Sequence, residues 1–230
     1  MFICCLFFIL QWERRTIPTR YTACNPNLQQ SNKWLLSDQI TVSKANRIDI
    51  TVTYQITSCP TCVNVVDLHV NQSDQVVSDK KDNYPDPLSD TAAYEKVAEI
   101  KQAIDSKNSE TISVLVKGRY TILAFHNYGA CSTLFSVKVT YNVCPDETLS
   151  RSLVSLQKTV APANDSDTIR VEGSCIKDAV KVSGSLFAHC KSNGEWNTTG
   201  LEGRCICEED MESNGGICEG NNVASFGIQT

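Results

Sequence analysis

The chain has 230 residues, enough for one large domain or two modest ones, and 41% of them are apolar, which is enough for a packed core. Eleven Gly and seven Pro are too few for a collagen-like or low-complexity chain. The formal net charge is −5 at pH 7 and no basic cluster occurs, so a nucleic-acid binder is not expected. The three histidines are few for a histidine-rich metal site, and neither a metal nor a cofactor is expected.

The first predicted element is the apolar run Phe2–Leu10, which is too short to span a bilayer and fits the core of a signal peptide. A positive segment before it and an A-x-A cleavage motif are missing, so a truncated or mis-started reading frame is the alternative. We expect residues 1–11 to be a signal peptide, and no other run is long enough for a transmembrane helix. The chain is therefore predicted to be secreted or to lie on the extracellular face of the plasma membrane.

The cysteines agree with that compartment. Cys4 and Cys5 lie in the signal segment, and the ten that remain are an even number, as a disulfide framework requires. Four lie before residue 144, in a part that can hold an apolar core, and six lie from Cys144 to Cys218, in a small part that needs disulfides. We place the domain boundary at Cys144–Pro145. N-glycosylation sequons begin at Asn71, Asn164 and Asn197.

The first part is predicted to be β. Arg47–Thr57 alternates strictly between apolar and polar residues, which is typical of a half-buried antiparallel strand. Further β-rich runs cover residues 63–70, 111–116, 119–126 and 133–141. In the last run we expect one face to hold Phe135, Val137, Val139 and Tyr141. Several strands without alternating helices predict an all-β sandwich or jelly roll.

One stretch departs from this pattern. Four residues have helical spacing and predict a helix near Val97: Tyr94, Val97, Ala98 and Ile104. Asp79–Asp90 before it is polar and holds two Pro, so it must be a loop, and loops of that length are usually functional or disordered.

The residues indicate no catalytic chemistry. Cys59-Pro60-Thr61-Cys62 is a C-x-x-C, but it lies between strands rather than at a helix N-terminus, which favours a structural disulfide over a redox pair. Zinc ligation at this motif would need a second Cys/His pair at the right spacing. His126 ends an apolar strand and is expected to be a structural edge histidine. No nucleophile elbow, metalloprotease motif or phosphate loop occurs, so the chain is predicted not to be an enzyme.

The motifs in their order resemble the extracellular part of Eph receptors. The segment Gly118–Pro145, with Tyr128-Gly129-Ala130-Cys131 inside it, resembles the end of the ephrin-binding domain of that family. Tyr21-Thr22-Ala23-Cys24 and Asn32-Lys33-Trp34-Leu35 are similar to its first motifs. After the boundary, Val171-Glu172-Gly173-Ser174-Cys175 and Asn193-Gly194-Glu195-Trp196 resemble its cysteine-rich region.

The resemblance implies a jelly-roll β-sandwich over residues 12–143, a sushi-like module over 144–205, the start of an EGF-like repeat over 206–220 and an unstructured tail over 221–230. Trp196 should lie against the bridges of the sushi-like module. The implied disulfides are Cys24–Cys131, Cys59–Cys62, Cys144–Cys190, Cys175–Cys205 and Cys207–Cys218.

The resemblance also implies a function: binding of a membrane-anchored, ephrin-like protein in an apolar channel beside Cys24–Cys131, with receptor clustering as a further expectation. We expect the loop Lys80–Ala93 to form one wall of that channel. Its apolar candidates for contact are Tyr84, Pro85, Leu88 and Tyr94.

Two other functions are compatible with the residues. One is a secreted jelly-roll binder of carbohydrate or lipid headgroups. Trp34 and Trp196, the tryptophans expected in the folded parts, both fit core positions, which argues against sugar stacking. The other is a redox protein that acts through Cys59 and Cys62.

Overall fold

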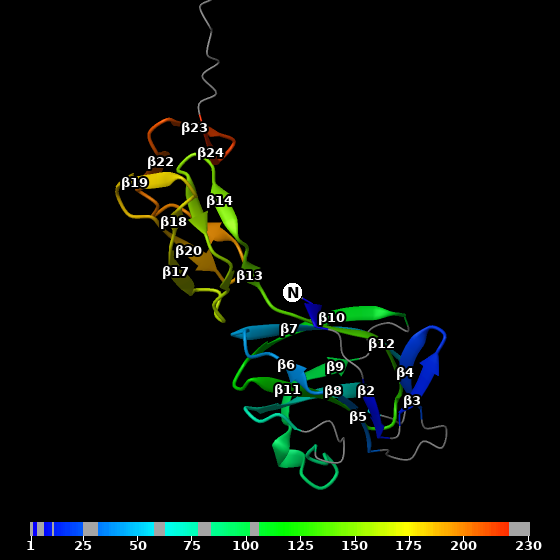
Figure 1. Cartoon of the computed structure of the whole chain (residues 1–230). Coiled ribbons are helices and arrows are strands. Elements are labelled where there is room, and N and C mark those ends of the chain that lie inside the picture. Colours follow the sequence, from blue (N-terminus) through cyan, green and yellow to red (C-terminus); the bar gives the residue numbers. More distant parts are fainter. Residues whose placement is uncertain are drawn as a thin grey trace, which may run out of the picture. The chain divides into compact units, whose positions relative to one another are not determined.

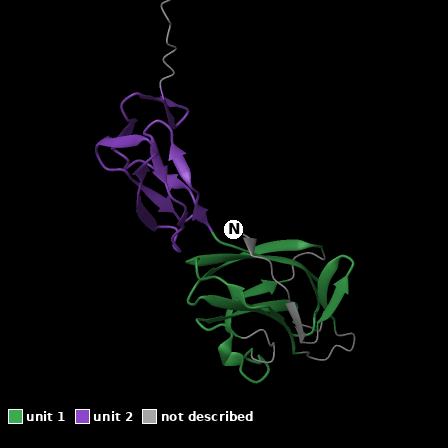
Figure 2. Cartoon of the chain, in the orientation of Figure 1, with its two compact units in different colours: residues 1–141 green, residues 142–230 purple. Residues whose placement is uncertain are grey.

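The computed structural model describes residues 2–3, 7–10, 12–24, 32–57, 63–77, 84–101 and 106–220; for residues 2–3 and 7–10 it describes the backbone alone. The chain divides into two compact units, residues 1–141 and 142–230 (Figure 2). This division lies within three residues of the predicted boundary at Cys144–Pro145. The described residues form strands and one 3-10 turn, so the all-β prediction is confirmed.

Unit 1 contains two antiparallel sheets, which Figure 1 shows as layers. Sheet A has the order β10-β7-β12-β4-β3, with β1 also paired to β12, and sheet B has the order β2-β5-β11-β8-β9, with β6 also paired to β11. Sheet A comprises β1 (Phe2–Ile3), β3 (Glu13–Thr16), β4 (Thr19–Ala23), β7 (Arg47–Thr57), β10 (Asn108–Leu115) and β12 (Cys131–Thr140). Sheet B comprises β2 (Phe7–Leu10), β5 (Lys33–Ser37), β6 (Ile40–Thr41), β8 (Val65–Ser73), β9 (Glu95–Lys101) and β11 (Tyr120–Asn127).

Strand β7 confirms the alternation that its sequence predicts. Every second residue from Ile48 to Ile56 is buried, and the residues between them are partly exposed. Ile50 and Val52 are fully buried, as are Leu35, Leu68 and Phe125 of sheet B. These apolar side chains form the main core of unit 1, because one face of each sheet is kept from water.

Strand β12 corrects one predicted face. The pairing of β12 with β7 shifts between Leu134 and Ser136, so Phe135 is the extra residue of a β-bulge. The buried positions are therefore Ser132 and Leu134 before the bulge and Val139 after it. Phe135 does not share the buried face of Val139; its ring is half-buried and lies under the Nζ of Lys107, at 4.9 Å.

The predicted helix near Val97 is wrong. Residues 95–101 form strand β9, which pairs with β8 along its length, and only a 3-10 turn, η2 (Thr91–Ala93), precedes it. Ile104 lies outside the described residues. Ile100 is fully buried, and the backbone groups of β9 bond to β8. The hydrogen bonds offered by a neighbouring strand outweigh a short helical spacing, which is ambiguous in a segment of this length.

The apolar run Phe2–Leu10, which is expected to be the core of a signal peptide, contains the strands β1 and β2. β1 pairs with β12, and β2 pairs with β5 from Phe7–Ser37 to Leu10–Trp34. A short apolar run suits a strand of a sandwich as well as a signal core, because both need only a continuous apolar segment. Cleavage of residues 1–11 stays a prediction. In the part of the chain that the structure describes, no helix is long and apolar enough to cross a membrane.

Trp12 was not expected in the core. Its side chain is 2% exposed, and its indole Nε1 donates a hydrogen bond to the Lys33 carbonyl, 3.3 Å away. The prediction that only Trp34 and Trp196 lie in folded parts is therefore wrong. Trp12 directly follows residues 1–11, the expected signal peptide, so the sequence analysis did not count it among the core residues.

Unit 2 is built from short strands, and its sheets are β13-β16, β14-β15-β18, β17-β20-β21, β19-β22 and β23-β24. Their bounds are β13 (Val143–Cys144), β14 (Glu147–Leu149), β15 (Val154–Leu156), β16 (Thr159–Val160), β17 (Thr168–Glu172), β18 (Ser174–Cys175), β19 (Ala179–Ser183), β20 (Phe187–Lys191), β21 (Trp196–Asn197), β22 (Arg204–Cys207), β23 (Met211–Asn214) and β24 (Ile217–Gly220).

Disulfides hold unit 2 together, as expected for a module with little core. The bonded pairs are Cys144–Cys190, Cys175–Cys205 and Cys207–Cys218, the connectivity that the resemblance implies. Trp196 packs against both buried clusters of this unit, one holding Cys144 and Cys190 and the other holding Cys205. Its ring is half-buried rather than buried, and its Nε1 donates to the Pro145 carbonyl at 2.8 Å.

Candidate functional site

Sheet B carries a second apolar cluster on the face turned away from the main core. Along β11, Leu123 and Phe125 belong to the main core, whereas Ile122 and Ala124 point to the other side, because side chains alternate along a strand. Trp34 and Leu36 of β5 are the neighbours of this row, since Leu36 pairs with Ala124. The cluster consists of Trp34, Leu36, Tyr94, Ile122 and Ala124, each at most 5% exposed. We call this surface the outer face of sheet B.

The segment 84–94 covers the outer face. In Figure 1 this segment, with η2 at its end, lies on the side of sheet B away from sheet A. Tyr84 and Ala93 pack against the cluster, and Tyr94 is part of it. The Tyr94 hydroxyl donates to the Pro85 carbonyl at 2.7 Å, and the Tyr84 hydroxyl accepts from the backbone N–H of Gln39 at 2.9 Å. Burial raises the pKa of Tyr94 above its ordinary value. The segment is thus held on the sheet by specific bonds.

The predicted contact residues differ in accessibility. Tyr94 is 4% exposed and lies in the cluster, so it is a core residue rather than a surface contact. Tyr84 and Pro85 are half-buried. Leu88 is 47% exposed at the tip of a turn, where its N–H donates to the Asp86 carboxylate at 2.9 Å. Residues 78–83 of the loop lie outside the described residues, so a channel bounded by Lys80–Ala93 stays a prediction.

One end of the outer face adjoins the Cys24–Cys131 disulfide, which is formed as the resemblance implies. The Lys33 Nζ donates to the Cys24 carbonyl at 3.1 Å, and Lys33 pairs with Asn127 next to the Trp34–His126 pair. The buried Asn127 side chain donates to the Ala130 carbonyl and accepts from the Gly129 N–H, at 2.9 and 2.8 Å. Gly129 has a φ of 128°, which only glycine adopts readily, and this explains the glycine before Cys131. The Cys59–Cys62 pair lies outside the described residues.

A polar cluster at the same end was missed by the sequence reasoning. His126 lies on β11, inside sheet B rather than at its edge, so the expected edge histidine is instead a central one. Its ring stacks on Trp34, with centroids 4.1 Å apart and planes 6° apart. Burial lowers the pKa of His126 to about 4 and also lowers the pKa of His69. Burial and the bond to Asp67 raise the pKa of Tyr128 to about 12.

Strand pairing brings this cluster together. Asp67 is the partner of His126 across β8 and β11, and His69 follows Asp67 by two residues on the same face of β8. The two histidines are far apart in sequence, so no local motif could have revealed them. The one available signal was that both interrupt apolar strands.

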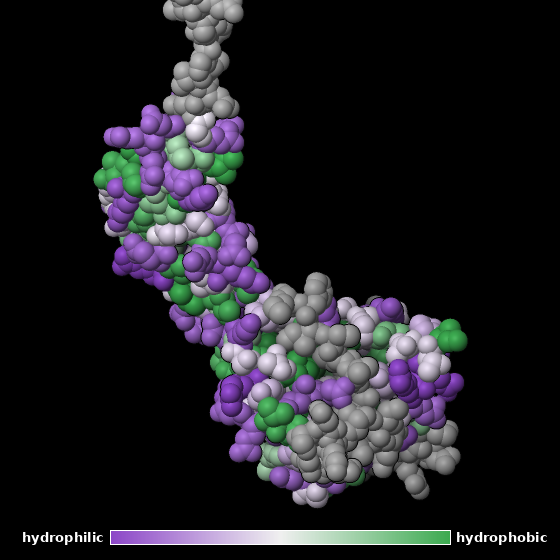
Figure 3. All heavy atoms as spheres, in the orientation of Figure 1, coloured by the Kyte–Doolittle hydropathy of each residue, from purple (hydrophilic) through white to green (hydrophobic). Residues whose placement is uncertain are grey.

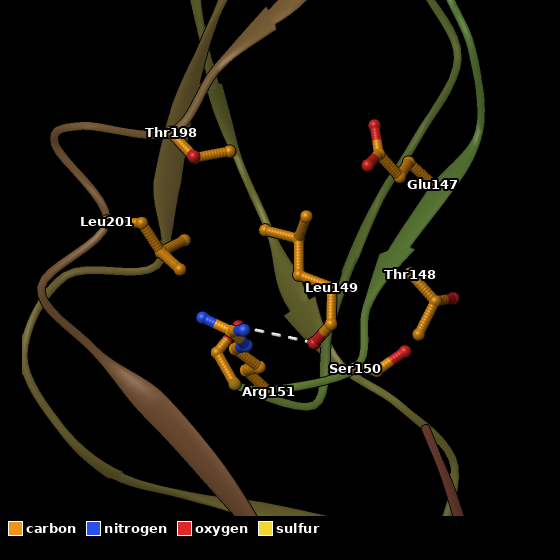
Figure 4. Close-up of a pocket in the computed structure, with 8 residues that line it drawn as sticks. Glu147, Thr148, Leu149, Ser150, Arg151, Thr198 and Leu201 are labelled. Carbon is orange, nitrogen blue, oxygen red and sulfur yellow. Dashed lines mark hydrogen bonds between the residues drawn. The ribbon is translucent and has the colours of Figure 1, made fainter. Parts of the chain in front are cut away.

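Unit 2 contains an open cavity of about 450 Å³, shown in Figure 4. It is lined by Glu147, Thr148, Leu149, Ser150, Arg151, Ser152, Thr198 and Leu201. A second cavity of about 350 Å³ lies against Trp196. Exposed apolar residues of this unit include Val180, Val182 and Ile206, and Figure 3 shows hydrophobic surface over the region of β19. These features define surfaces but bring no reactive groups together.

The three sequons lie in different settings. Asn71 lies near the end of β8, and its amide Nδ2 donates to the Ala93 carbonyl at 2.7 Å, under the segment that covers the outer face. Asn164 is exposed, and its amide bonds to the nearby Asp167 carboxylate, at 2.8 Å. Asn197 is engaged through its carbonyl oxygen, which accepts from Thr199 at 2.8 Å.

We therefore predict that the folded, secreted protein carries glycans at Asn164 and Asn197 and none at Asn71. A glycan on Asn71 would remove its bond to Ala93 and displace the covering segment. Peptide mass spectrometry before and after enzymatic deglycosylation in ¹⁸O-labelled water shows which of the three asparagines carried a glycan. A glycan at Asn71 in correctly folded protein would contradict the position of segment 84–94.

A loop-covered sandwich with a disulfide at the edge of the covered face, followed by a disulfide-rich module, is an architecture suited to extracellular ligand binding. Comparisons with known proteins agree with this class. Residues 10–144 match the family model described as the ephrin receptor ligand binding domain, and residues 147–207 match the ephrin cysteine rich domain. The chain therefore belongs to the Eph receptor family.

Individual relatives support the assignment. The chain is 30% identical to ephrin type-A receptor 5 of Rattus norvegicus over 212 residues, which are 86% of this chain and 20% of the relative. It is 29% identical to ephrin type-B receptor 2 of Gallus gallus over 227 residues, 90% of this chain and 22% of the relative. The chain thus spans about a fifth of the length of these relatives. Neither of the two matched family models describes a catalytic domain.

Among solved structures, the chain resembles an endo-1,4-beta-D-xylanase of Clostridium thermocellum with a TM-score of 0.37 and 9% identity, over 65% of this chain and 27% of that chain. This likeness is too low to bear on the fold or the ligand.

Proposed function

We propose that this chain is the extracellular ligand-binding portion of an Eph-like receptor and that unit 1 binds an ephrin-like protein on a neighbouring cell. The observation that carries the proposal is the apolar outer face of sheet B, covered by segment 84–94 and bordered by Cys24–Cys131, in the part that matches the ligand-binding family model. The face supports the segment that covers it, and that segment presents Leu88, which is 47% exposed, to solvent. Apolar anchors of that kind supply most of the binding energy in protein interfaces.

The alternatives have less support. Trp12 and Trp34 are 2% and 3% exposed, so neither offers an open ring for sugar stacking. A redox function would need reactive Cys59 and Cys62, and titration of accessible thiols in the native protein tests for them. Receptor clustering is part of the proposal only as an expectation carried over from the family resemblance.

A substitution at Leu88 best separates an effect on binding from an effect on folding. It is 47% exposed, so Leu88→Ala leaves the core intact. If Leu88 contacts ligand, the variant weakens binding to a soluble ephrin ectodomain by more than about 1 kcal/mol, or about fivefold in Kd. The measurement is biolayer interferometry with the whole chain immobilised and ephrins of both the A and B classes in solution.

Leu115→Ala is the matched control. Leu115 is 51% exposed on β10, the edge strand of sheet A, away from the outer face of sheet B. Its truncation should leave Kd unchanged. If the wild-type chain binds no ephrin of either class, the proposed function is wrong. If Leu88→Ala and Leu115→Ala behave alike while the wild type binds, the site lies elsewhere on the chain.

A further inference from the structure

Three hydrogen-bond acceptors converge beside the outer face of sheet B. A carboxylate oxygen of Asp67 and one ring nitrogen each of His69 and His126 lie within 4.8 Å of one another. Asp67 and His126 are buried and His69 is half-buried, with 14% of its side chain exposed. The side chains share one face because Asp67 pairs with His126 across the strands and His69 lies two residues along β8. Strand geometry thus gathers the three groups without any sequence motif.

The tautomer of His69 follows from its partner. Its Nδ1 lies 3.4 Å from the carbonyl oxygen of Tyr94. A carbonyl only accepts, so Nδ1 carries the proton and Nε2 keeps its lone pair. That Nε2 is buried and has no hydrogen-bond partner. Histidines that bind metals commonly have this arrangement, in which one nitrogen donates to a carbonyl and the other points its lone pair at the ion.

The tautomer of His126 follows from a chain of two bonds. The Trp34 Nε1 only donates, and it lies 2.9 Å from Asn32 Oδ1, which fixes the orientation of the Asn32 amide. His126 Nε2 lies 2.6 Å from the same oxygen and is therefore the protonated nitrogen. Nδ1 of His126 keeps the lone pair. Asn32 thus orients His126 as the Tyr94 carbonyl orients His69.

Asp67 completes the set, and its Oδ2 lies 4.0 Å from His69 Nε2. Its Oδ2 accepts from the Tyr128 hydroxyl at 2.7 Å and lies 2.9 Å from the Lys96 Nζ. Its Oδ1 is buried and has no partner, although Asp67 as a whole is only 2% exposed. A buried acceptor without a donor is costly, and it indicates a missing cation or water. Among the described residues, this is the one place where such atoms of a carboxylate and a histidine lie together.

We propose that Asp67, His69 and His126 bind a divalent metal ion such as Zn²⁺ beside the candidate ligand-binding face. Two imidazole nitrogens and one carboxylate oxygen are ligands that Zn²⁺ accepts, and a water completes a tetrahedral set. The ion would take the lone pair of His69 Nε2 and lie against the Asp67 carboxylate, whose negative charge favours a cation over a neutral water.

The charges around the site are compatible with an added cation. Lys96 faces Asp67, but its side chain is 41% exposed and also bonds to Glu99 at 2.7 Å. When an ion neutralises Asp67, Lys96 keeps Glu99 as its partner. An ion there would link β8 to β11 and hold His126 against Trp34, so it would stiffen the end of the outer face beside Cys24–Cys131.

Isothermal titration calorimetry of the whole chain with ZnCl₂ tests the proposal, after chelator treatment and with any free thiols blocked by alkylation. We expect one Zn²⁺ per chain at this site. His69→Gln and Asp67→Asn should each weaken binding by more than about tenfold. Asp67→Asn keeps an acceptor for the Tyr128 hydroxyl, so it serves as the variant that disturbs packing least.

His189→Gln is the matched control, because His189 is the third histidine of the chain, lies in unit 2 and bonds to Thr168 at 3.2 Å. It should bind Zn²⁺ as the wild type does. Circular dichroism confirms that each variant is folded. No heat from the wild-type chain would overturn the proposal, as would wild-type affinity in both His69→Gln and Asp67→Asn. Neither result bears on ephrin binding, which is measured separately without metal.

Discussion

Loss of the Cys24–Cys131 bond is expected to destabilise unit 1 by about 4–5 kcal/mol, because the bond closes a loop of 107 residues and so removes conformational entropy from the unfolded chain. Domains of this size have about 5–15 kcal/mol of stability in total, so the variant should be close to unfolding and poorly secreted. The double variant Cys24→Ser/Cys131→Ser avoids a stray thiol. Urea unfolding of unit 1, followed by Trp fluorescence and circular dichroism, measures the loss.

Cys207→Ser/Cys218→Ser is the control for this prediction. That bond closes only 11 residues in unit 2, and the same entropy treatment gives about 3 kcal/mol for it. It should leave the unfolding midpoint of unit 1 unchanged. A Cys24→Ser/Cys131→Ser protein as stable as the wild type would show that the bond contributes little, and peptide mapping that pairs Cys24 with another cysteine would contradict the fold.

Truncation of Tyr94 is expected to have the second large effect. Tyr94→Ala removes a ring that is 4% exposed and packs in the outer-face cluster, so it should cost about 3–5 kcal/mol. Tyr94→Phe removes only the hydroxyl that donates to the Pro85 carbonyl and should cost about 1 kcal/mol. Denaturant unfolding of the two variants separates the packing of the ring from its hydrogen bond.

The same pair of variants tests whether Tyr94 supports the site or contacts the ligand. Because Tyr94 is buried, Tyr94→Phe should bind ephrin almost as the wild type does, while Tyr94→Ala should lose binding together with the order of segment 84–94. A Tyr94→Ala protein with wild-type stability but no binding would reverse this assignment and make Tyr94 a contact residue.

The sequence predicted most strands of unit 1 where burial alternates cleanly. β7 is the clearest case, because its pairing on both sides demands one buried face and the residues follow it. β9 escaped prediction because its apolar residues have a spacing that also fits a helix, and only its pairing with β8 reveals that residues 95–101 are extended. The bulge at Phe135 escaped for a related reason, since one extra residue inverts the faces without leaving a local signal.

By itself, the sequence determined the all-β class, the two-part organisation and the order of cysteines and motifs that identifies the family. These depend on residue identity and spacing along the chain, and both can be read directly. The structure alone decided which residues lie together on the outer face of sheet B. Tyr94 joins Trp34 there, and His69 reaches His126, because β11 lies between β5 and β8 in the sheet although it comes much later in the chain than either. Long-range strand pairing creates such contacts, and nothing in a local pattern specifies the partner of a strand.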